Sequence, residues 1–145
     1  MTDANTSDEK STLYNIDGEI IYEFWRRQKK ATFMGSELKT DIQIGVVAYY
    51  PPKKHLLVCG SYREGNGHKN NGTCIYIYND THELVKVLDE PYVWENNQYK
   101  ISGVGCDEDN RVELLMREIG GEYVTWRMAL DMDTYKLTKI SYDPR

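Results

Sequence analysis

Beyond residue 41, apolar and polar residues alternate along much of the chain, and a period of two predicts β-strands. Turn residues rich in Asn, Asp and Gly separate the apolar runs, as expected of hairpins. Short links place sequential strands side by side. We therefore predict a mainly β fold, an eight-stranded antiparallel meander that closes its edges as an up-and-down barrel or a flattened sandwich. The expected strands are residues 41–50, 55–62, 73–79, 84–88, 98–106, 111–118, 122–131 and 135–142.

Strand faces follow from the same alternation. Two expected strands place these apolar residues on one face, as core candidates: Val112, Leu114, Met116, Val124, Trp126, Met128 and Leu130. Their opposite face carries Glu113, Arg117, Tyr123, Thr125 and Arg127, which we expect to face water and pair across strands. A β-propeller is the runner-up fold. Eight strands would make only two four-stranded blades, too few to close a ring.

Residues 13–31 fit two patterns. Asp17-Gly18 suits a hairpin between residues 13–16 and 19–25. The apolar residues, however, recur with helical spacing, at Ile20, Ile21, Phe24 and Trp25. Acidic residues come early in this segment and basic residues late, which suits the helix dipole, with Asp17 as N-cap. We therefore predict one N-terminal helix over about residues 18–31, with the hairpin as the alternative.

The N-terminal residues differ in composition from the rest of the chain. Residues 1–12 lack apolar content and predict a disordered tail, which leaves residues 13–145 as a single β-rich domain. The first ten residues are polar and acidic, and no apolar stretch of 18 residues occurs. We expect a cytoplasmic protein without membrane contact. Exposed strand edges, if the sheet stays open, make a dimer an alternative to a monomer.

The net charge of −5 is unevenly distributed along the chain. Residues 1–79 have a net charge of +1, whereas residues 80–122 carry 11 acidic residues against four basic ones, a net charge of −7. An acidic surface repels phosphate backbones and attracts cationic proteins. We therefore expect a basic protein partner and no direct contact with nucleic acid. An acidic surface that serves solubility alone is the alternative.

Residue patterns for catalysis or metal binding are weak. The three cysteines, Cys59, Cys74 and Cys106, have no CxxC spacing, so we expect free thiols. His55 and Cys59 lie about 13 Å apart along one strand, too far to share a metal ion. Apolar neighbours should raise the pKa of Cys59, and Asp107 should disfavour a Cys106 thiolate. We expect no metal site, no cofactor and no enzymatic activity.

The acidic stretch also holds aromatic residues that suit a protein interface. Its expected partner-binding residues are Asp89, Glu90, Tyr92, Trp94, Glu95, Asp107, Glu108 and Asp109. A small, acidic, motif-free chain with this surface resembles bacterial immunity proteins in profile. That resemblance implies a non-catalytic protein that sequesters a basic toxin domain, such as a nuclease. The alternative function is an intracellular β-barrel that binds a small apolar or aromatic ligand in its interior.

Overall fold

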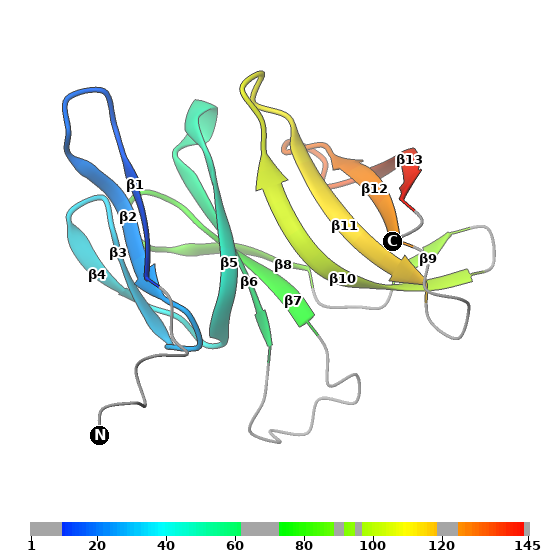
Figure 1. Ribbon diagram of the computed structural model, residues 1–145, viewed down its shortest axis with the longest axis horizontal. Coiled ribbons are helices and arrows are strands. Elements are labelled where there is room, and N and C mark those ends of the chain that lie inside the picture. Colours follow the sequence, from blue (N-terminus) through cyan, green and yellow to red (C-terminus); the bar gives the residue numbers. More distant parts are fainter. Residues whose placement is uncertain (1–9, 62–72, 89–91, 95–96, 119–124, 144–145) are drawn as a thin grey trace.

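The computed structural model describes residues 10–61, 73–88, 92–94, 97–118 and 125–143, which form antiparallel β-strands and one short 3-10 helix, η2 (Pro51–Lys53) (Figure 1). In sheet A, the strands are β1 (Lys10–Tyr14), β2 (Ile20–Trp25), β3 (Lys30–Phe33) and β4 (Ser36–Lys39). In sheet B, they are β5 (Gln43–Tyr50), β6 (His55–Ser61), β7 (Thr73–Tyr78) and β8 (Leu84–Leu88). In sheet C, they are β9 (Tyr92–Trp94), β10 (Asn97–Cys106), β11 (Val112–Glu118), β12 (Thr125–Leu130) and β13 (Leu137–Asp143).

The antiparallel meander is confirmed within each sheet, but the single closed barrel is wrong for the described part of the chain. Strands pair in chain order inside a sheet, and no ladder joins β4 to β5 or β8 to β9. Each of the eight predicted segments corresponds to a strand from β5 to β8 or β10 to β13. The number of strands is higher than the eight predicted, because the structure also contains β9 and the four strands of sheet A.

The predicted helix over residues 18–31 is also wrong, because β2 and the start of β3 occupy this segment. Asp17-Gly18 forms the hairpin turn that was the alternative, with Gly18 at a φ of 85°. In β2, Phe24 is buried and Trp25 is exposed, so the two neighbours lie on opposite faces of the sheet. Pairing with β1 and β3 thus outweighs the helical spacing of the apolar residues. Lys10–Thr12, assigned from sequence to the tail, belong to β1, and residues 1–9 lie outside the described part.

Sheet B lies between the other two sheets (Figure 1), and both of its faces are buried. Successive residues of β6 enter different cores. Leu57 and Cys59 pack in the cluster shared with sheet C, and Leu56 and Val58 in the cluster shared with sheet A. A strand covered on both faces is apolar at every position, which explains why β6 and β7 lack clear alternation.

The core prediction for sheet C is confirmed for the residues with described side chains. Val112, Leu114, Met116, Met128 and Leu130 are buried, and Trp126 packs against the same cluster. On the opposite face, the Arg127 guanidinium donates hydrogen bonds to both carboxylate oxygens of Glu113, at 2.7 and 2.8 Å. Val124 and Tyr123 lie outside the described residues.

One turn recurs in all three sheets, with Asn15, Asn79 or Asp107 as its first residue. The Oδ1 atom of this residue accepts hydrogen bonds from the backbone N–H groups two and four positions later, at 2.8–3.0 Å. The fourth position has a positive φ, at Gly18, His82 and Asn110. A longer variant begins at Asp131, which accepts from the N–H groups of Asp133 and Thr134. The side chain therefore holds each turn in one shape.

Candidate functional site

Turns from all three sheets collect at one end of the molecule. Within sheet B, the β5–β6 and β7–β8 turns share an end because the strands are antiparallel. The first of these turns contacts sheet C, where the Lys53 ammonium lies 2.7 Å from the Asp133 carboxylate. The second contacts sheet A, where His82 Nε2 lies 2.7 Å from the backbone oxygen of Phe33. Figure 1 shows the β1–β2, β5–β6 and β10–β11 turns along one edge.

This acidic end comprises residues 15–19, 51–54, 79–83, 107–111 and 131–136. It carries nine carboxylates and four Lys or Arg side chains, a net charge of −5. Sequence analysis placed the acidic surface in the single stretch 80–122. The fold instead gathers carboxylates from four separate turns, because each Asx turn begins with Asn or Asp and continues with acidic residues. That repeat, read from the sequence, is the signal that could have revealed this surface.

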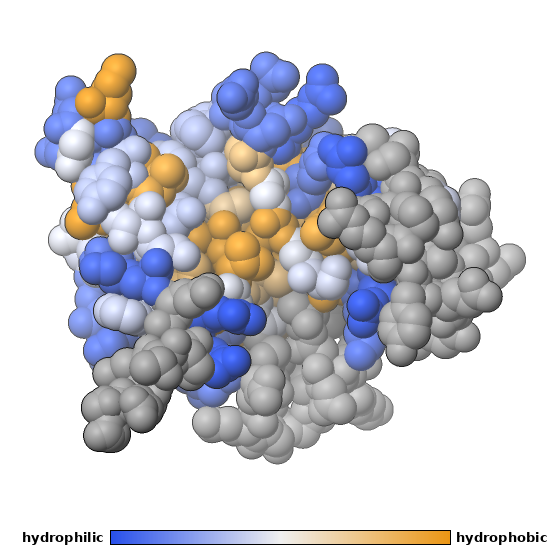
Figure 2. All heavy atoms as spheres, in the orientation of Figure 1, coloured by the Kyte–Doolittle hydropathy of each residue, from blue (hydrophilic) through white to orange (hydrophobic). Residues whose placement is uncertain are grey.

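The tip of the β1–β2 turn adds apolar surface to the acidic end. Ile16 is 99% exposed and Tyr14 is 58% exposed, and both lie close to Asp17 and Glu19 in the chain. Figure 2 shows a hydrophobic projection at the corresponding corner of the molecule. The turn itself is fixed, because Asn15 Oδ1 accepts from Asp17 and Glu19. Two exposed apolar residues on a fixed turn offer contact area that a partner could bury. Sequence analysis missed it, because residues 18–31 were assigned to a helix.

The described members of the predicted partner-binding set lie in two places along sheet C. Asp107, Glu108 and Asp109 are exposed on the β10–β11 turn, within the acidic end. The backbone of Tyr92 and Trp94 lies in β9, which pairs with Asn97–Tyr99 at the opposite end of β10. The ten residues of β10 span about 30 Å, so the two groups lie at separate ends of the strand. Asp89, Glu90 and Glu95 lie outside the described residues.

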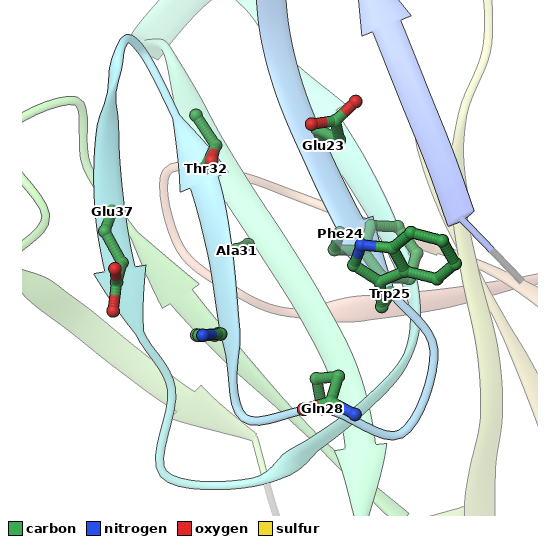
Figure 3. A pocket seen from close by; sticks show the side chains of 8 residues that line it. Glu23, Phe24, Trp25, Gln28, Ala31, Thr32 and Glu37 are labelled. Carbon is green, nitrogen blue, oxygen red and sulfur yellow. The ribbon is translucent and has the colours of Figure 1, made fainter. Parts of the chain in front are cut away.

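A second candidate surface lies on the outer face of sheet A, where a groove of about 500 Å³ runs over β2, β3 and β4 (Figure 3). A row of cross-strand partners crosses it: Thr12, Glu23, Thr32 and Glu37. Glu23 is held by β1, because its Oε2 accepts from Thr12 Oγ1 at 3.0 Å and lies 3.4 Å from Lys10 Nζ. Trp25 lies beside this row and is 46% exposed. The groove therefore combines a large aromatic ring with hydrogen-bonding side chains.

Cations gather beyond the groove, at the end of sheet A opposite the acidic end. This basic end comprises Arg26, Arg27, Lys29, Lys30 and Lys39, all exposed. Backbone hydrogen bonds fix the β2–β3 turn against the start of sheet B. Arg27 N–H donates to Ile44 O at 2.7 Å, and Ile44 N–H donates to Gln28 O at 2.9 Å. The linear charge count hid this cluster, because residues 1–79 also hold nine acidic residues, among them Glu37 and Asp41 beside the cluster itself.

The thiols of Cys59 and Cys106 are not activated, and the described residues form no group placed to hold a metal ion. Burial raises the pKa of Cys59 to about 12, and burial together with the Asp107 charge raises the pKa of Cys106, as predicted from sequence. Cys59 and Cys74 pack in different clusters on opposite faces of sheet B, and both are free thiols. In the described ranges, no group of three His, Cys, Asp or Glu side chains is placed to hold a metal ion.

Comparisons with known proteins found no match: no family model, no curated protein and no solved structure is similar to this chain. Among the described residues, no helix has the length and apolar character needed to cross a bilayer. Function must therefore be argued from the surfaces described above.

Proposed function

We propose that the chain is a non-catalytic binding protein that sequesters a basic protein partner, as a bacterial immunity protein does with a toxin such as a nuclease. The observation that carries this proposal is the acidic end, where turns of three sheets bring nine carboxylates to one surface. Such a surface accelerates association with a cationic protein by electrostatic steering. The exposed Ile16 supplies the apolar anchor that charge alone does not.

An interior ligand site is not proposed. That alternative rested on a closed barrel, and the described strands form three separate sheets whose facing surfaces are filled by buried side chains. The grooves over sheet A and beside the β10–β11 turn, all lined by described residues, are open at the surface.

The partner would be sought by retaining proteins from the native host lysate on the purified chain, at low and then at high salt. We expect a basic protein in stoichiometric amount that elutes as salt rises, because exposed charges are screened within about 8 Å at physiological ionic strength. The variant Glu108→Lys/Asp109→Lys should slow association and flatten its salt dependence. Ile16→Ser should accelerate dissociation instead, because it removes buried contact area and no charge.

Asp107 needs a different substitution. Its Oδ1 holds the turn through the N–H groups of Asp109 and Arg111, so charge reversal there would also disrupt the fold locally. Asp107→Asn removes the charge and keeps the acceptor, as Asn15 and Asn79 do in the other sheets. Lys100→Glu, which makes β10 more acidic outside the acidic end, is the control. Recovery of no basic protein, or equal affinity for all variants, would contradict the proposal.

A further inference from the structure

The basic end of sheet A carries five cations, and the Glu37 and Asp41 carboxylates, which lie beside Lys30 and Lys39 in one hollow, leave it a net charge of +3. Arg26, Arg27, Lys30 and Lys39 are exposed, and none of the four forms an ion pair within the described part of the chain. The backbone that carries them is fixed, because the β2–β3 turn is hydrogen-bonded to Ile44, and Thr40 N–H donates to Lys29 O at 2.8 Å. These cations therefore form a preformed surface for anions.

The register of sheet A places two of these cations directly opposite each other. Lys30 of β3 pairs with Lys39 of β4, so both side chains leave the same face of the sheet. Like charges at directly opposed positions destabilise a sheet. A bound anion between them would remove this repulsion. A local arrangement that opposes folding is expected where a binding site requires it.

An aromatic ring completes the surface. Trp25 is the β2 residue opposite Lys10 of β1, and the Lys10 ammonium lies 5.7 Å from the centre of its ring. The groove is also lined by the amide of Gln28, by Thr32 and by the carboxylates of Glu23 and Glu37 (Figure 3). Phosphate-binding cations next to an exposed indole are the two components with which proteins bind single-stranded nucleic acid. Double-stranded nucleic acid fits less well, because its bases are stacked and cannot lie on Trp25.

We propose that the outer face of sheet A, at its basic end, binds single-stranded nucleic acid. Phosphates contact Lys30, Lys39 and the β2–β3 turn, and one base stacks on Trp25. The expectation of no direct nucleic-acid contact rested on the acidic stretch 80–122, and the basic end of sheet A lies outside that stretch. The six residues of β2 separate the ends by about 20 Å, which exceeds the screening length of about 8 Å at physiological ionic strength. The acidic end therefore does not prevent binding at the basic end.

The test is fluorescence anisotropy of a labelled single-stranded oligonucleotide of about 12 nucleotides, titrated with the full chain over a range of salt concentrations. We expect affinity to fall with salt, with a slope of about 0.7 for each phosphate contacted. Trp25→Leu should weaken binding about tenfold and leave that slope unchanged, because stacking is independent of charge.

Lys39→Glu separates binding from folding. It converts the Lys30–Lys39 pair into an opposite-charge pair, so it should raise the urea midpoint of unfolding and still weaken oligonucleotide binding at least tenfold. Loss of binding in a more stable variant cannot result from misfolding. The matched control is Lys100→Glu, which has the same charge change at a residue that also faces a like charge, Arg117, in sheet C. Its affinity should stay within about twofold of the wild type.

Three results would overturn the proposal. The first is absence of binding by the wild-type chain at low salt. The second is equal loss of affinity in Lys39→Glu and Lys100→Glu, which would mean that only total charge matters. The third is a combined result: polyglutamate of similar length competes as effectively as unlabelled oligonucleotide, and Trp25→Leu binds the oligonucleotide with the affinity of the wild type. A simple polyanion would then account for binding. None of these outcomes bears on the acidic end, so the two proposals are tested separately.

Discussion

His55, at the start of β6, shows how a single residue links the fold to pH. Its Nδ1 atom is buried and has no hydrogen-bond partner in the described structure. Burial lowers the pKa of His55, and the nearby Lys53 ammonium lowers it further, against a smaller opposing effect of Asp80. The folded chain therefore favours a neutral imidazole.

The first prediction concerns stability against pH. Below about pH 6.5 the unfolded chain binds a proton at His55 that the folded chain disfavours, so the free energy of unfolding falls as pH decreases through this region. Urea unfolding at about pH 7.5 and pH 5.5 measures the change. His55→Gln, which does not titrate, should lose less stability over this interval. An equal loss in both proteins would place the effect at other residues.

At the scale of single elements, two glycines in comparable strands have very different surroundings. A Cβ atom on Gly60, in β6, would lie within van der Waals overlap of the backbone oxygen of Gln43 in the neighbouring strand β5, whereas one on Gly105, in β10, would meet nothing within 4 Å. Gly60 faces Ile44 close to the bulge that shifts the β5–β6 register. The close approach of two backbones, rather than an unusual φ, requires glycine there.

The second prediction follows from this difference. Gly60→Ala should lower the free energy of unfolding by about 1–3 kcal/mol or more, because backbone on both sides must shift. Gly105→Ala should leave the free energy of unfolding unchanged or raise it by about 0.4–1 kcal/mol, because alanine reduces the conformational entropy of the unfolded chain. Equilibrium urea unfolding of both variants compares them directly. Similar values for the two would mean that β5 adjusts to the added methyl group.

Elements were predictable where local pattern and tertiary environment agree. The strands from β5 to β8 and from β10 to β13 were located from their apolar runs, which do not clearly alternate in β6 and β7, and from the turn residues between them, to within three residues at each end. Sheet A was missed because Ile20, Ile21, Phe24 and Trp25 have helical spacing in a segment that also begins with a hairpin turn. Exposed apolar residues on the β1–β2 hairpin caused this error, since Ile20 and Trp25 lie outside the core.

The candidate site was less predictable, because it depends on how sheets stack. The acidic turn Asp107–Asp109 was predicted correctly as an exposed acidic segment. The repeated Asx turn could be recognised in the sequence, but periodicity did not show that residues 15–19 and 131–136 lie at the same end of the molecule as this turn. It also did not show that β9, with Tyr92 and Trp94, pairs at the opposite end of β10. Sequence periodicity and short links predict which neighbouring strands pair. The arrangement of the three sheets depends instead on sheet B having two apolar faces, one for each outer sheet.

At the scale of the molecule, sheet B makes the three sheets interdependent. Its buried residues contribute to both hydrophobic clusters. Separation of sheet A or of sheet C from sheet B would therefore expose apolar surface of sheet B. Polar contacts between turns add to this link, with Lys53 bridging to sheet C and His82 to sheet A.

The third prediction is that the described sheets unfold as one unit. Phe33→Ala in sheet A and Leu114→Ala in sheet C each remove a fully buried side chain and should each lower the free energy of unfolding by about 3 kcal/mol. Far-UV circular dichroism and tryptophan fluorescence should give coincident urea transitions in both variants. Two separate transitions, with each variant shifting only one of them, would show that the sheets fold independently.

The recurring Asx turn has a consequence for how this surface changes over time. The turn requires an Oδ1 acceptor at its first position and is indifferent to whether an amide or a carboxylate supplies it, as Asn15, Asn79, Asp107 and Asp131 show. Mutation can therefore exchange Asn and Asp at these four places with little effect on the strands behind them. The electrostatic identity of this end is free to diversify while the architecture that displays it stays constant.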